Sequence, residues 1–402
     1  MSSAVPLEVA LTPTDLALLH RLGADAQRAG TTLWLVGGSV RDALLGVPVL
    51  DIDLASEMTA EDLLHATGLK ATSRSQFSTC KVAAGGRTID LATARSERYA
   101  RPGALPSVSL GTMASDLARR DFTINAMAVS LAPGDFGALL DPFDGAADLR
   151  TGIVRGLHSA TFQDDATRAL RAVRYAARLG FRIHPTTRRW LRADVHHLDG
   201  ISPARVHREL RRTVEEWDGG RALLLAHRLG VLHSIHAALG SEDIAARLQR
   251  ARHAGASADA LLGVLLSEVD PAVARERLAL TRFESGIVAH IHRLQRDDRL
   301  VMPLLLPSRC ADVVDGAPDS AVEAVACIRS AEARRNIRRY LRGHERRPYL
   351  RGADLAAMGV PPGRTLGAVL GMLRSAVADG RLKTRRGERA FVRQASREEF
   401  AA

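Results

Sequence analysis

Two acidic side chains, Asp51 and Asp53, flank Ile52 within the stretch LVGGSVRDALLGVPVLDIDLAS, residues 35–56. If this segment is a strand, both carboxylates point to the same face, because successive side chains of a strand alternate. Packing gives no reason to keep two like charges side by side, whereas a divalent cation between them would turn the repulsion into a binding site. Two Mg²⁺ ions bound there could hold the attacking and the leaving oxygen of an in-line displacement. The same pattern also occurs as a plain surface pair, so its surroundings must decide.

A pair of glycines, Gly37 and Gly38, precedes the acids and is followed by Arg41. A glycine turn into a helix exposes backbone N–H groups, the helix N-terminus adds partial positive charge, and Arg41 lies one turn further on. This arrangement predicts a site for a triphosphate, although it also fits an ordinary turn from strand to helix. The segment has neither G-x-x-x-x-G-K-[ST] nor G-x-G-x-x-G, which argues against P-loop and dinucleotide-binding folds.

Three more residues could join these acids and glycines. Asp90 lies in the middle of the predicted strand TIDLATA, where it is either a third metal ligand or the outward residue of an edge strand. In DLARRDFTINAMA, residues 116–128, Arg120 can neutralise phosphate and Asp121 can accept a hydrogen bond from a ribose hydroxyl. The alternative for this second group is a solvated charge cluster before a strand.

A stripe of charged residues follows in DDATRALRAVR, residues 164–174. Asp165, Arg168, Arg171 and Arg174 recur every three residues and share one face of a predicted helix. A ladder of surface ion pairs would give the same pattern and contribute only about 0.2–0.5 kcal/mol per pair. The acid pair and the phosphate cradle earlier in the chain favour a nucleotide-binding stripe instead.

Alternating and helical periodicities indicate the elements that position these residues. Helices are predicted over 14–29, after Gly38 and over 59–67, and strands over 32–36, 50–56 and 122–130, with a hairpin formed by CKVAA and TIDLATA. Residues 95–115 are predicted to be a long loop. After about residue 160 nearly every segment has a helical pattern, the first of them a helix running through the charged stripe. The fold class is therefore α+β, a small mixed sheet with helices on one side followed by a mostly α-helical arm.

Composition limits the partners and the compartment. The 402 residues include 56 Lys+Arg against 45 Asp+Glu, a net charge of +11, which favours a polyanion such as nucleic acid. Cys80, Cys310 and Cys327 are too scattered for a disulfide framework or a zinc site. We expect a cytoplasmic protein with no leader sequence, no membrane contact and no obligate protein partner.

Four motifs, in this order, resemble the class II tRNA nucleotidyltransferase/poly(A) polymerase family, which includes the CCA-adding enzymes. They are LVGGSVRD with LDIDLA, DLARRDFTINAMA, FQDDATRALRAVRYAARLGF and SPARVHRELRR. The resemblance implies a polymerase-β-like nucleotidyltransferase head over 1–150, a nucleotide-selecting neck over 151–215, a helical body over 216–330 and a tRNA-contacting tail over 331–402. It also implies that the 3′-hydroxyl of tRNA attacks the α-phosphate of CTP or ATP and releases pyrophosphate.

The resemblance also implies a role for each candidate residue. Asp51 and Asp53 would hold Mg²⁺, with Asp90 as the third carboxylate. Asp165 and Arg168 would read the Watson–Crick edge of the incoming base. The remaining candidates would contact the phosphates or the ribose of the nucleotide: Gly37, Gly38, Arg41, Arg120, Asp121, Arg171 and Arg174.

Several activities stay open within the family. The family usually has Glu-Asp where this chain has Asp164-Asp165, and the segment after Arg95, which bears on the change from C to A addition, is rich in Pro and Gly. Full CCA addition is favoured over CC-only addition, A-only addition and poly(A) synthesis. A non-catalytic RNA-binding protein is disfavoured by the intact Asp51 and Asp53 and by an aromatic content of 4%, low for a surface that stacks single strands.

The densest basic run is ARRNIRRYLRGHERR, residues 333–347. Arg335, Arg338 and Arg339 within it are predicted to contact the RNA backbone. The helical arm is expected to contact the acceptor stem and elbow of tRNA through shape and phosphates.

Overall fold

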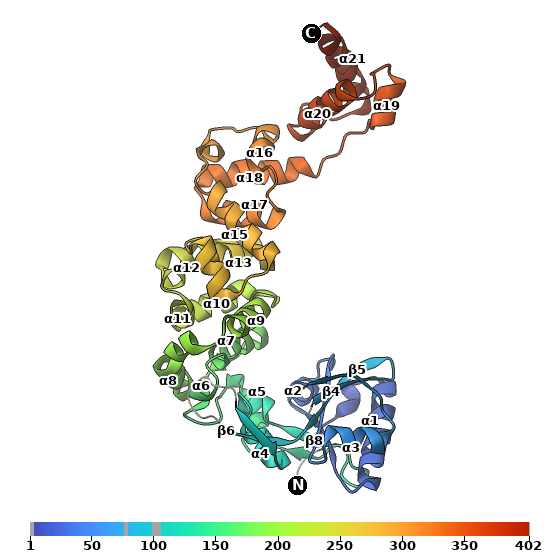
Figure 1. Ribbon diagram of the computed structural model, residues 1–402, viewed down its shortest axis with the longest axis vertical. Coiled ribbons are helices and arrows are strands. Elements are labelled where there is room, and N and C mark those ends of the chain that lie inside the picture. The colour runs from blue at the N-terminus through green and yellow to red at the C-terminus, as the bar shows by residue number, and fades with distance from the viewer. Residues whose placement is uncertain (1–3, 76–78, 99–105, 402) are drawn as a thin grey trace. The chain divides into compact units, whose positions relative to one another are not determined.

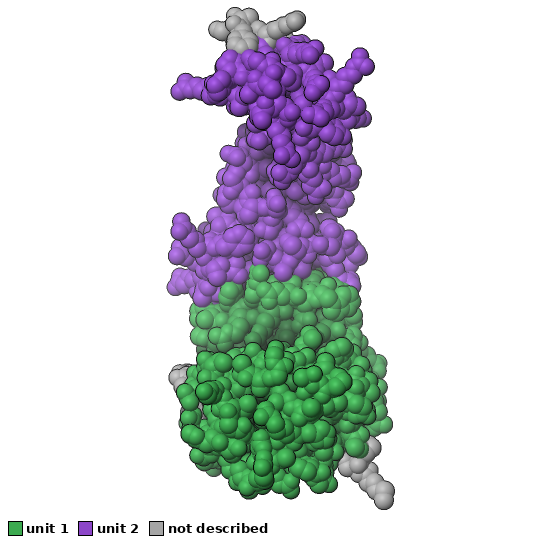
Figure 2. All heavy atoms as spheres, turned by 90° about the vertical axis from the view of Figure 1, so that its right-hand side faces the viewer, with its two compact units in different colours: residues 1–237 green, residues 238–402 purple. Residues whose placement is uncertain are grey.

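The computed structural model describes residues 4–75, 79–98 and 106–401 (Figure 1). The chain divides into two compact units, residues 1–237 and 238–402, which Figure 2 colours separately. The finer predicted division at residues 150, 215 and 330 stays a prediction. Each unit is described by itself below.

A seven-stranded mixed sheet forms the first part of unit 1. Its order is β3-β4-β5-β2-β1-β8-β9, and β2 and β5 are parallel while all other neighbours are antiparallel. The strands are β1 Leu33–Val36, β2 Ile52–Ser56, β3 Ala71–Ser75, β4 Thr79–Ala84, β5 Arg87–Thr93, β8 Ala128–Ser130 and β9 Leu139–Leu140. The predicted mixed sheet and the predicted β4–β5 hairpin are confirmed.

One face of this sheet is buried under helices α1 (Pro13–Arg28) and α3 (Ala60–Thr67), which Figure 1 shows beside the strands. Thr12 caps α1 and Thr59 caps α3, each accepting a hydrogen bond from a backbone N–H in the first turn. The core joins leucines of α1 and α3 to alternate residues of the strands, among them Leu35, Ile52 and Ile89. Because side chains alternate, every second residue of β2 and β5 must face away from this core.

The prediction of a long loop over residues 95–115 is wrong for the described part of that segment. Residues 95–98 and 107–110, expected in a loop, pair as the antiparallel hairpin β6 (Arg95–Arg98) and β7 (Ser107–Leu110). Every residue of β7 is exposed, so this segment lacks the alternation of apolar and polar residues that marks a half-buried strand. The Pro- and Gly-containing residues 99–105 lie outside the described residues. Helix α4 (Met113–Ala118) comes next.

The strand predicted over 122–130 is limited to β8, because residues Thr123–Asn125 form a 3₁₀ turn, η2. The carboxylate of Asp121 accepts hydrogen bonds from the backbone N–H of Phe122 (2.8 Å) and from Nδ2 of Asn125 (3.0 Å). Such local side-chain bonds offer the backbone an alternative to sheet pairing. The charged residues before β8 are thus held in a compact turn.

The helix predicted to run through the charged stripe is interrupted. Helix α6 (Thr161–Asp164) ends at Asp165, whose backbone is extended, and α7 (Arg168–Leu179) begins three residues later. Oδ1 of Asp165 accepts hydrogen bonds from the N–H (2.9 Å) and the hydroxyl (2.6 Å) of Thr167, which stabilises this break. Asp165 therefore stands before the helix that carries the three arginines.

The rest of the chain is mostly helical, as predicted. Unit 1 also contains η1 Leu7–Val9, α2 Gly38–Leu44, α5 Gly145–Thr151, α8 Pro185–Asp194, η3 Val195–Gly200, α9 Pro203–Val214, α10 Gly219–Arg228, α11 Val231–Ile235 and the parallel pair β10 Ile153–Val154 and β11 Arg182–Ile183. The 3₁₀ helix η4, Ala237–Gly240, lies at the division between the units.

Unit 2 consists of helices. They are α12 Glu242–Ala254, α13 Ala258–Leu266, α14 Pro271–Leu278, α15 Arg282–Leu294, η5 Asp298–Val301, α16 Pro307–Val314, α17 Asp319–Ile328, α18 Ala331–His344, α19 Gly352–Ala357, α20 Arg364–Ala378 and α21 Arg385–Ala401. Helices α19 to α21 share a small apolar cluster around Leu355, Val369 and Leu373. Among the residues described, no helix combines the length and the apolar character needed to cross a bilayer.

Candidate active site

The open face of the sheet carries the candidate acids. Ile52 and Leu54 of β2 and Ile89 and Leu91 of β5 enter the core under α1 and α3, so Asp53 and Asp90 between them face the other way. The two aspartates are direct partners in the parallel β2–β5 register and therefore lie side by side. The structure thus brings the predicted third carboxylate next to Asp53.

Asp51 stands immediately before β2 and is held by the glycine turn. The hydroxyl of Ser39, at the start of α2, donates to the carbonyl oxygen of Asp51 (2.8 Å) and accepts from the N–H of Asp53 (3.0 Å). Ser39 is 3% exposed, so this bridge is shielded from water. It fixes the acid pair relative to Gly37 and Gly38, which the sequence places only two and one residues before Ser39.

The acids repel one another in the folded chain. Burial and then the charge of Asp90, with a smaller contribution from Asp51, raise the pKa of Asp53 from its ordinary value of 3.8 to about 6, although Arg120 and Lys81 oppose the rise. Nζ of Lys81 on β4 is 3.0 Å from Oδ1 of Asp90. Asp90 is therefore already paired with a positive charge. Asp53 has no cationic side chain in direct contact among the described residues.

The carboxylates of Asp51 and Asp53 fit a Mg²⁺ ion that takes its other ligands from a bound nucleotide. Within the described ranges, no three or more His, Cys, Asp or Glu side chains are arranged as a ready-made metal cage. Mg²⁺ usually binds one or two carboxylates and takes its other ligands from phosphates and water. Burial and then the charge of Asp90 raise the pKa of Asp53, and a bound cation would favour its charged form, so Asp53 and Asp51 stay the predicted ligands.

Metal-free protein in which Asp53 is replaced by asparagine is expected to be more stable than the wild type at pH 7.5. The pKa of Asp53 is higher in the folded chain than in the unfolded one, so ionisation of this group destabilises the fold as pH rises from about 4 through about 6. The gain should be on the order of 1–2 kcal/mol after allowance for partial exposure, and it should vanish near pH 4. Urea unfolding at both pH values measures it, and an equal or lower stability at pH 7.5 would contradict the assigned repulsion.

The turn before α2 has a backbone that requires glycine at its first position. Gly37 has φ +67° and ψ −125°, and a Cβ built on it would lie 2.5 Å from Nη1 of Arg120. The Arg120 guanidinium is held there by Oδ2 of Asp116 (2.9 Å) and by the carbonyl of Asn125 (3.3 Å). Gly37 therefore leaves room for Arg120 directly beside the N-terminus of α2.

Replacement of Gly37 by alanine is expected to lower the free energy of unfolding by about 1–3 kcal/mol, chiefly because its positive φ strains any residue with a Cβ, and it would also displace the end of the Arg120 side chain. Gly38→Ala is the matched control. Its φ is not positive, and the added Cβ would meet Arg41 only at 3.6 Å, an ordinary contact. Its unfolding free energy should be unchanged or raised by up to about 1 kcal/mol. Denaturant titration compares the two variants, and equal losses would contradict this distinction.

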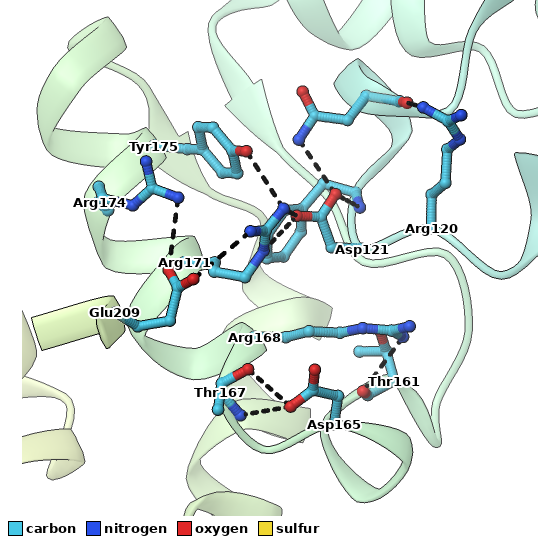
Figure 3. A network of polar contacts seen from close by, with 12 residues as sticks. Arg120, Asp121, Thr161, Asp165, Thr167, Arg168, Arg171, Arg174, Tyr175 and Glu209 are labelled. Atoms are coloured by element: carbon cyan, nitrogen blue, oxygen red, sulfur yellow. Dashed lines mark hydrogen bonds and ion pairs between the residues drawn. The ribbon is translucent and has the colours of Figure 1, made fainter. Parts of the chain in front are cut away.

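Arg171 and Asp121 form the centre of a polar network that joins α7 to the turn before β8 (Figure 3). Arg171 donates through Nε (2.8 Å) and Nη2 (2.6 Å) to Oδ2 of Asp121. Burial would raise the pKa of Asp121, but Arg171 and the hydrogen bond from Asn125 outweigh it, so the pKa is below its ordinary value. With Phe122 and Asn125 on Oδ1, all four lone-pair positions of the carboxylate are in use. The predicted ribose contact of Asp121 would have to displace one of these donors.

Tyr175 on α7 gathers three of the predicted arginines around its ring. The guanidinium carbons of Arg41, Arg171 and Arg174 lie 5.4, 5.6 and 5.0 Å from the ring centroid. Arg41 also donates through Nη1 to Oδ1 of Asn125 (2.8 Å). The aromatic face offers the cations a favourable contact without a bound anion. Sequence reasoning missed Tyr175, although its i+4 spacing from Arg171 could have indicated it.

Arg168 and Asp165 lie at the other end of the network (Figure 3). Arg168 is 5% exposed and donates through Nη1 to the hydroxyl of Thr161 (2.9 Å) and through Nη2 to the carbonyl of Arg119 (2.7 Å). Asp165 uses Oδ1 for Thr167 and for an ion pair with Arg205 (2.9 Å), whereas Oδ2 receives no hydrogen bond from the described residues. The two side chains do not bind each other; both are fixed by other groups.

A single cavity of about 870 Å³ brings the acids and the stripe together. The predicted residues that line it are Gly37, Gly38, Arg41, Asp53, Asp90, Arg120, Asp121, Asp165, Arg168 and Arg171. Asp51 and Arg174 are not lining residues; Arg174 instead approaches Glu209 and Glu216, each at 3.4 Å. The cavity is also lined by arginines that sequence reasoning left unassigned: Arg74, Arg95, Arg119, Arg178, Arg205 and Arg208. The last two belong to the motif SPARVHRELRR, which was the available signal.

Comparison with known proteins identifies the family. Residues 33–155 match the poly(A) polymerase head domain, and residues 180–239 match the domain described as the probable RNA- and SrmB-binding site of polymerase A. An A-adding tRNA nucleotidyltransferase of Halalkalibacterium halodurans is 34% identical over 375 residues, which cover 88% of this chain and 86% of that protein. The chain belongs to the class II tRNA nucleotidyltransferase/poly(A) polymerase family.

Other members of the family are similar over nearly the whole chain. A CC-adding tRNA nucleotidyltransferase of Geobacter sulfurreducens is 31% identical over 407 residues, covering 90% of this chain and 91% of that protein. The structure of the Thermotoga maritima CCA-adding enzyme complexed with tRNA(CCA) has a TM-score of 0.78 and 27% identity, with 98% of each chain covered. The predicted family and the predicted fold class are confirmed, and the relatives differ in which nucleotides their names say they add.

Proposed function

We propose that this protein transfers nucleotides from CTP and ATP to the 3′ end of tRNA and so builds its terminal CCA, with Mg²⁺ as the metal. The observation that carries the proposal is the shared cavity, in which Asp53 and Asp90 of the sheet and Arg168 and Arg171 of α7 line one space. A polymerase that uses no nucleic-acid template needs both parts in one site, because the acids must act on the triphosphate while fixed hydrogen-bond donors select its base.

Each side of the cavity has a distinct task in this proposal. Asp51 and Asp53 would hold Mg²⁺, which would supply positive charge to the reacting phosphate. The α2 N-terminus and Arg120 would hold the triphosphate, with Arg41 beside them. Arg168, fixed by Thr161 and Arg119, and the unused Oδ2 of Asp165 would present donors and an acceptor to the edge of the base. Asp121 would act chiefly by orienting Arg171.

Addition of A alone is the second candidate. It is favoured by the A-adding relative, which is more similar to this chain than the CC-adding relative described above. The hairpin β6–β7 bears on this choice, because Glu97 of β6 is 3.0 Å from Nη1 of Arg119, whose carbonyl accepts from Arg168. A change in the hairpin could reach the base-reading arginine through these two contacts.

One gel decides between the candidates. Purified protein is given tRNA that lacks the whole terminus, tRNA ending in the first C, tRNA ending in both Cs and complete tRNA, each with CTP, ATP or both. Full CCA activity predicts extension of all three incomplete substrates and none of the complete one. Extension only of the tRNA ending in both Cs, with ATP, would assign A addition; CC addition without A, or long A tails, would assign the remaining alternatives. No extension of any substrate would contradict the proposed function.

A further inference from the structure

A second cavity, of about 420 Å³, lies within unit 2 among helices α12, α17 and α18. It is lined by Arg250 of α12 and by Arg334 and Arg338 of α18, together with His253, Cys327 and Glu323. Arg334 and Arg338 are four residues apart and so share one face of α18, whereas Arg335 and Arg339 belong to the neighbouring face. Of these four arginines in the basic run, Arg334 and Arg338 therefore line the cavity, and the other two belong to a different face of α18.

Two of the three arginines, Arg250 and Arg334, are held by the C-terminal end of α17. Nε of Arg250 donates to the carbonyl of Cys327 (2.8 Å), and Nε of Arg334 donates to the carbonyl of Ala326 (3.2 Å). These are carbonyls of the last helical turn, which carries partial negative charge. Each bond uses only the Nε–H, so the two terminal nitrogens of each guanidinium keep their donors for another acceptor.

The positive charge of this cavity is only partly balanced by its own acid. Three arginines face one carboxylate, Glu323, which accepts hydrogen bonds from the N–H and the hydroxyl of Ser257, at 3.2 and 2.6 Å. Burial raises the pKa of Cys327, which keeps its thiol neutral. Burial, then the charges of Arg334 and Arg247, lower the pKa of Arg250, which records repulsion among the cations. An anion in the cavity would remove this repulsion.

We propose that this cavity binds a phosphate group, and that the phosphate is a phosphodiester of the tRNA backbone. Arginine presents paired N–H donors that match phosphate oxygens, and three of them converge here. The cavity is large enough for a phosphate with its attached sugar. The RNA part of this inference rests on the proposed function, whereas the phosphate part does not.

Two neighbouring charge reversals test the inference on the full chain. Arg338 is exposed and makes no hydrogen bond or ion pair with the described residues, so Arg338→Glu should fold and would place a competing carboxylate at the cavity. Arg339→Glu makes the same change of charge on an exposed residue of the other face, so it leaves the cavity intact and removes only the separate backbone contact that the sequence predicts for Arg339. Hydrogen–deuterium exchange is measured with inorganic phosphate and, separately, with tRNA, in peptides covering residues 247–255 and 326–341.

Phosphate and tRNA should each slow exchange of these peptides in the wild type and in Arg339→Glu, but not in Arg338→Glu. The affinity for tRNA should fall about tenfold in Arg338→Glu and at most about threefold in Arg339→Glu, with a correspondingly smaller salt dependence. Protection by phosphate but not by bound tRNA would overturn the RNA assignment. Absence of protection by either ligand, or equal protection in the two variants, would overturn the cavity itself. Protein that binds no tRNA but is protected by phosphate would contradict the proposed function and support the phosphate site.

Discussion

Replacement of Asp53 by asparagine is expected to lower nucleotide addition in a single turnover by at least about a thousandfold, because it removes a charged metal ligand from the reacting phosphate. Asp53 lies on the open face of the sheet beside Asp90, and a neutral amide cannot replace its negative charge. The affinity for tRNA should stay within about twofold of the wild type, since no phosphate-binding cation is lost. Quench-flow with radiolabelled tRNA measures addition, and a filter-binding titration measures affinity.

Two further variants separate catalysis from general damage. Asp25→Asn makes the same chemical change on α1, which covers the opposite face of the sheet, and should leave addition unchanged. Asp90→Asn should have an intermediate effect, because Asp90 already pairs with Lys81. Addition by Asp53→Asn at even a tenth of the wild-type rate would remove Asp53 from the metal site.

Replacement of Arg168 by alanine is expected to reduce the preference for CTP and ATP over UTP and GTP by about 10- to 100-fold. A correctly placed pair of hydrogen bonds to a base edge contributes about 1–3 kcal/mol of discrimination. Arg168 is buried and anchored at both terminal nitrogens, so its position is set before the nucleotide arrives. The ratio of kcat/KM values for the four triphosphates is the measurement.

Arg178→Ala is the control for this prediction. Arg178 also lies on α7 and lines the same cavity, but it is outside the three-residue repeat that ends at Arg174. Its loss should weaken binding of all four nucleotides to a similar extent. Thermal unfolding of both variants shows whether the buried Arg168 is also needed for the fold, and Arg168→Lys keeps the charge if alanine is not tolerated. Unchanged selectivity in a folded Arg168 variant would exclude its role in reading the base.

The sequence predicts the part of this structure that depends on local patterns. Capping residues and periodicity locate α1 and α3, and the alternation around Asp53 and Asp90 places both acids opposite the buried face. Arg120 and Gly37, by contrast, are far apart in the chain, and their close approach appears only in three dimensions.

The remaining failures arise from specific polar contacts and from strands that lack an apolar pattern. The interruption between α6 and α7 depends on hydrogen bonds from Thr167 to Asp165, which a helical stripe does not reveal. The pairing of Arg171 with Asp121 joins residues fifty positions apart. In the β6–β7 hairpin, β7 is exposed and the partly buried β6 is formed of polar residues, so neither strand shows an apolar alternation. Polar contacts, both local and between distant residues, therefore decide the detailed geometry of the cavity, while the apolar pattern decides the sheet that supports it.

The central claim is that the acids of the sheet hold a metal beside a nucleotide whose base reaches the start of α7. A crystal structure with Mn²⁺ and a non-hydrolysable ATP analogue tests this claim most directly, because Mn²⁺ is located by its anomalous scattering. The account predicts an anomalous peak bound by Asp53 and the triphosphate, with the adenine edge within hydrogen-bond distance of Arg168 or Asp165. A peak away from Asp53, or a base that lies outside the cavity, would contradict it.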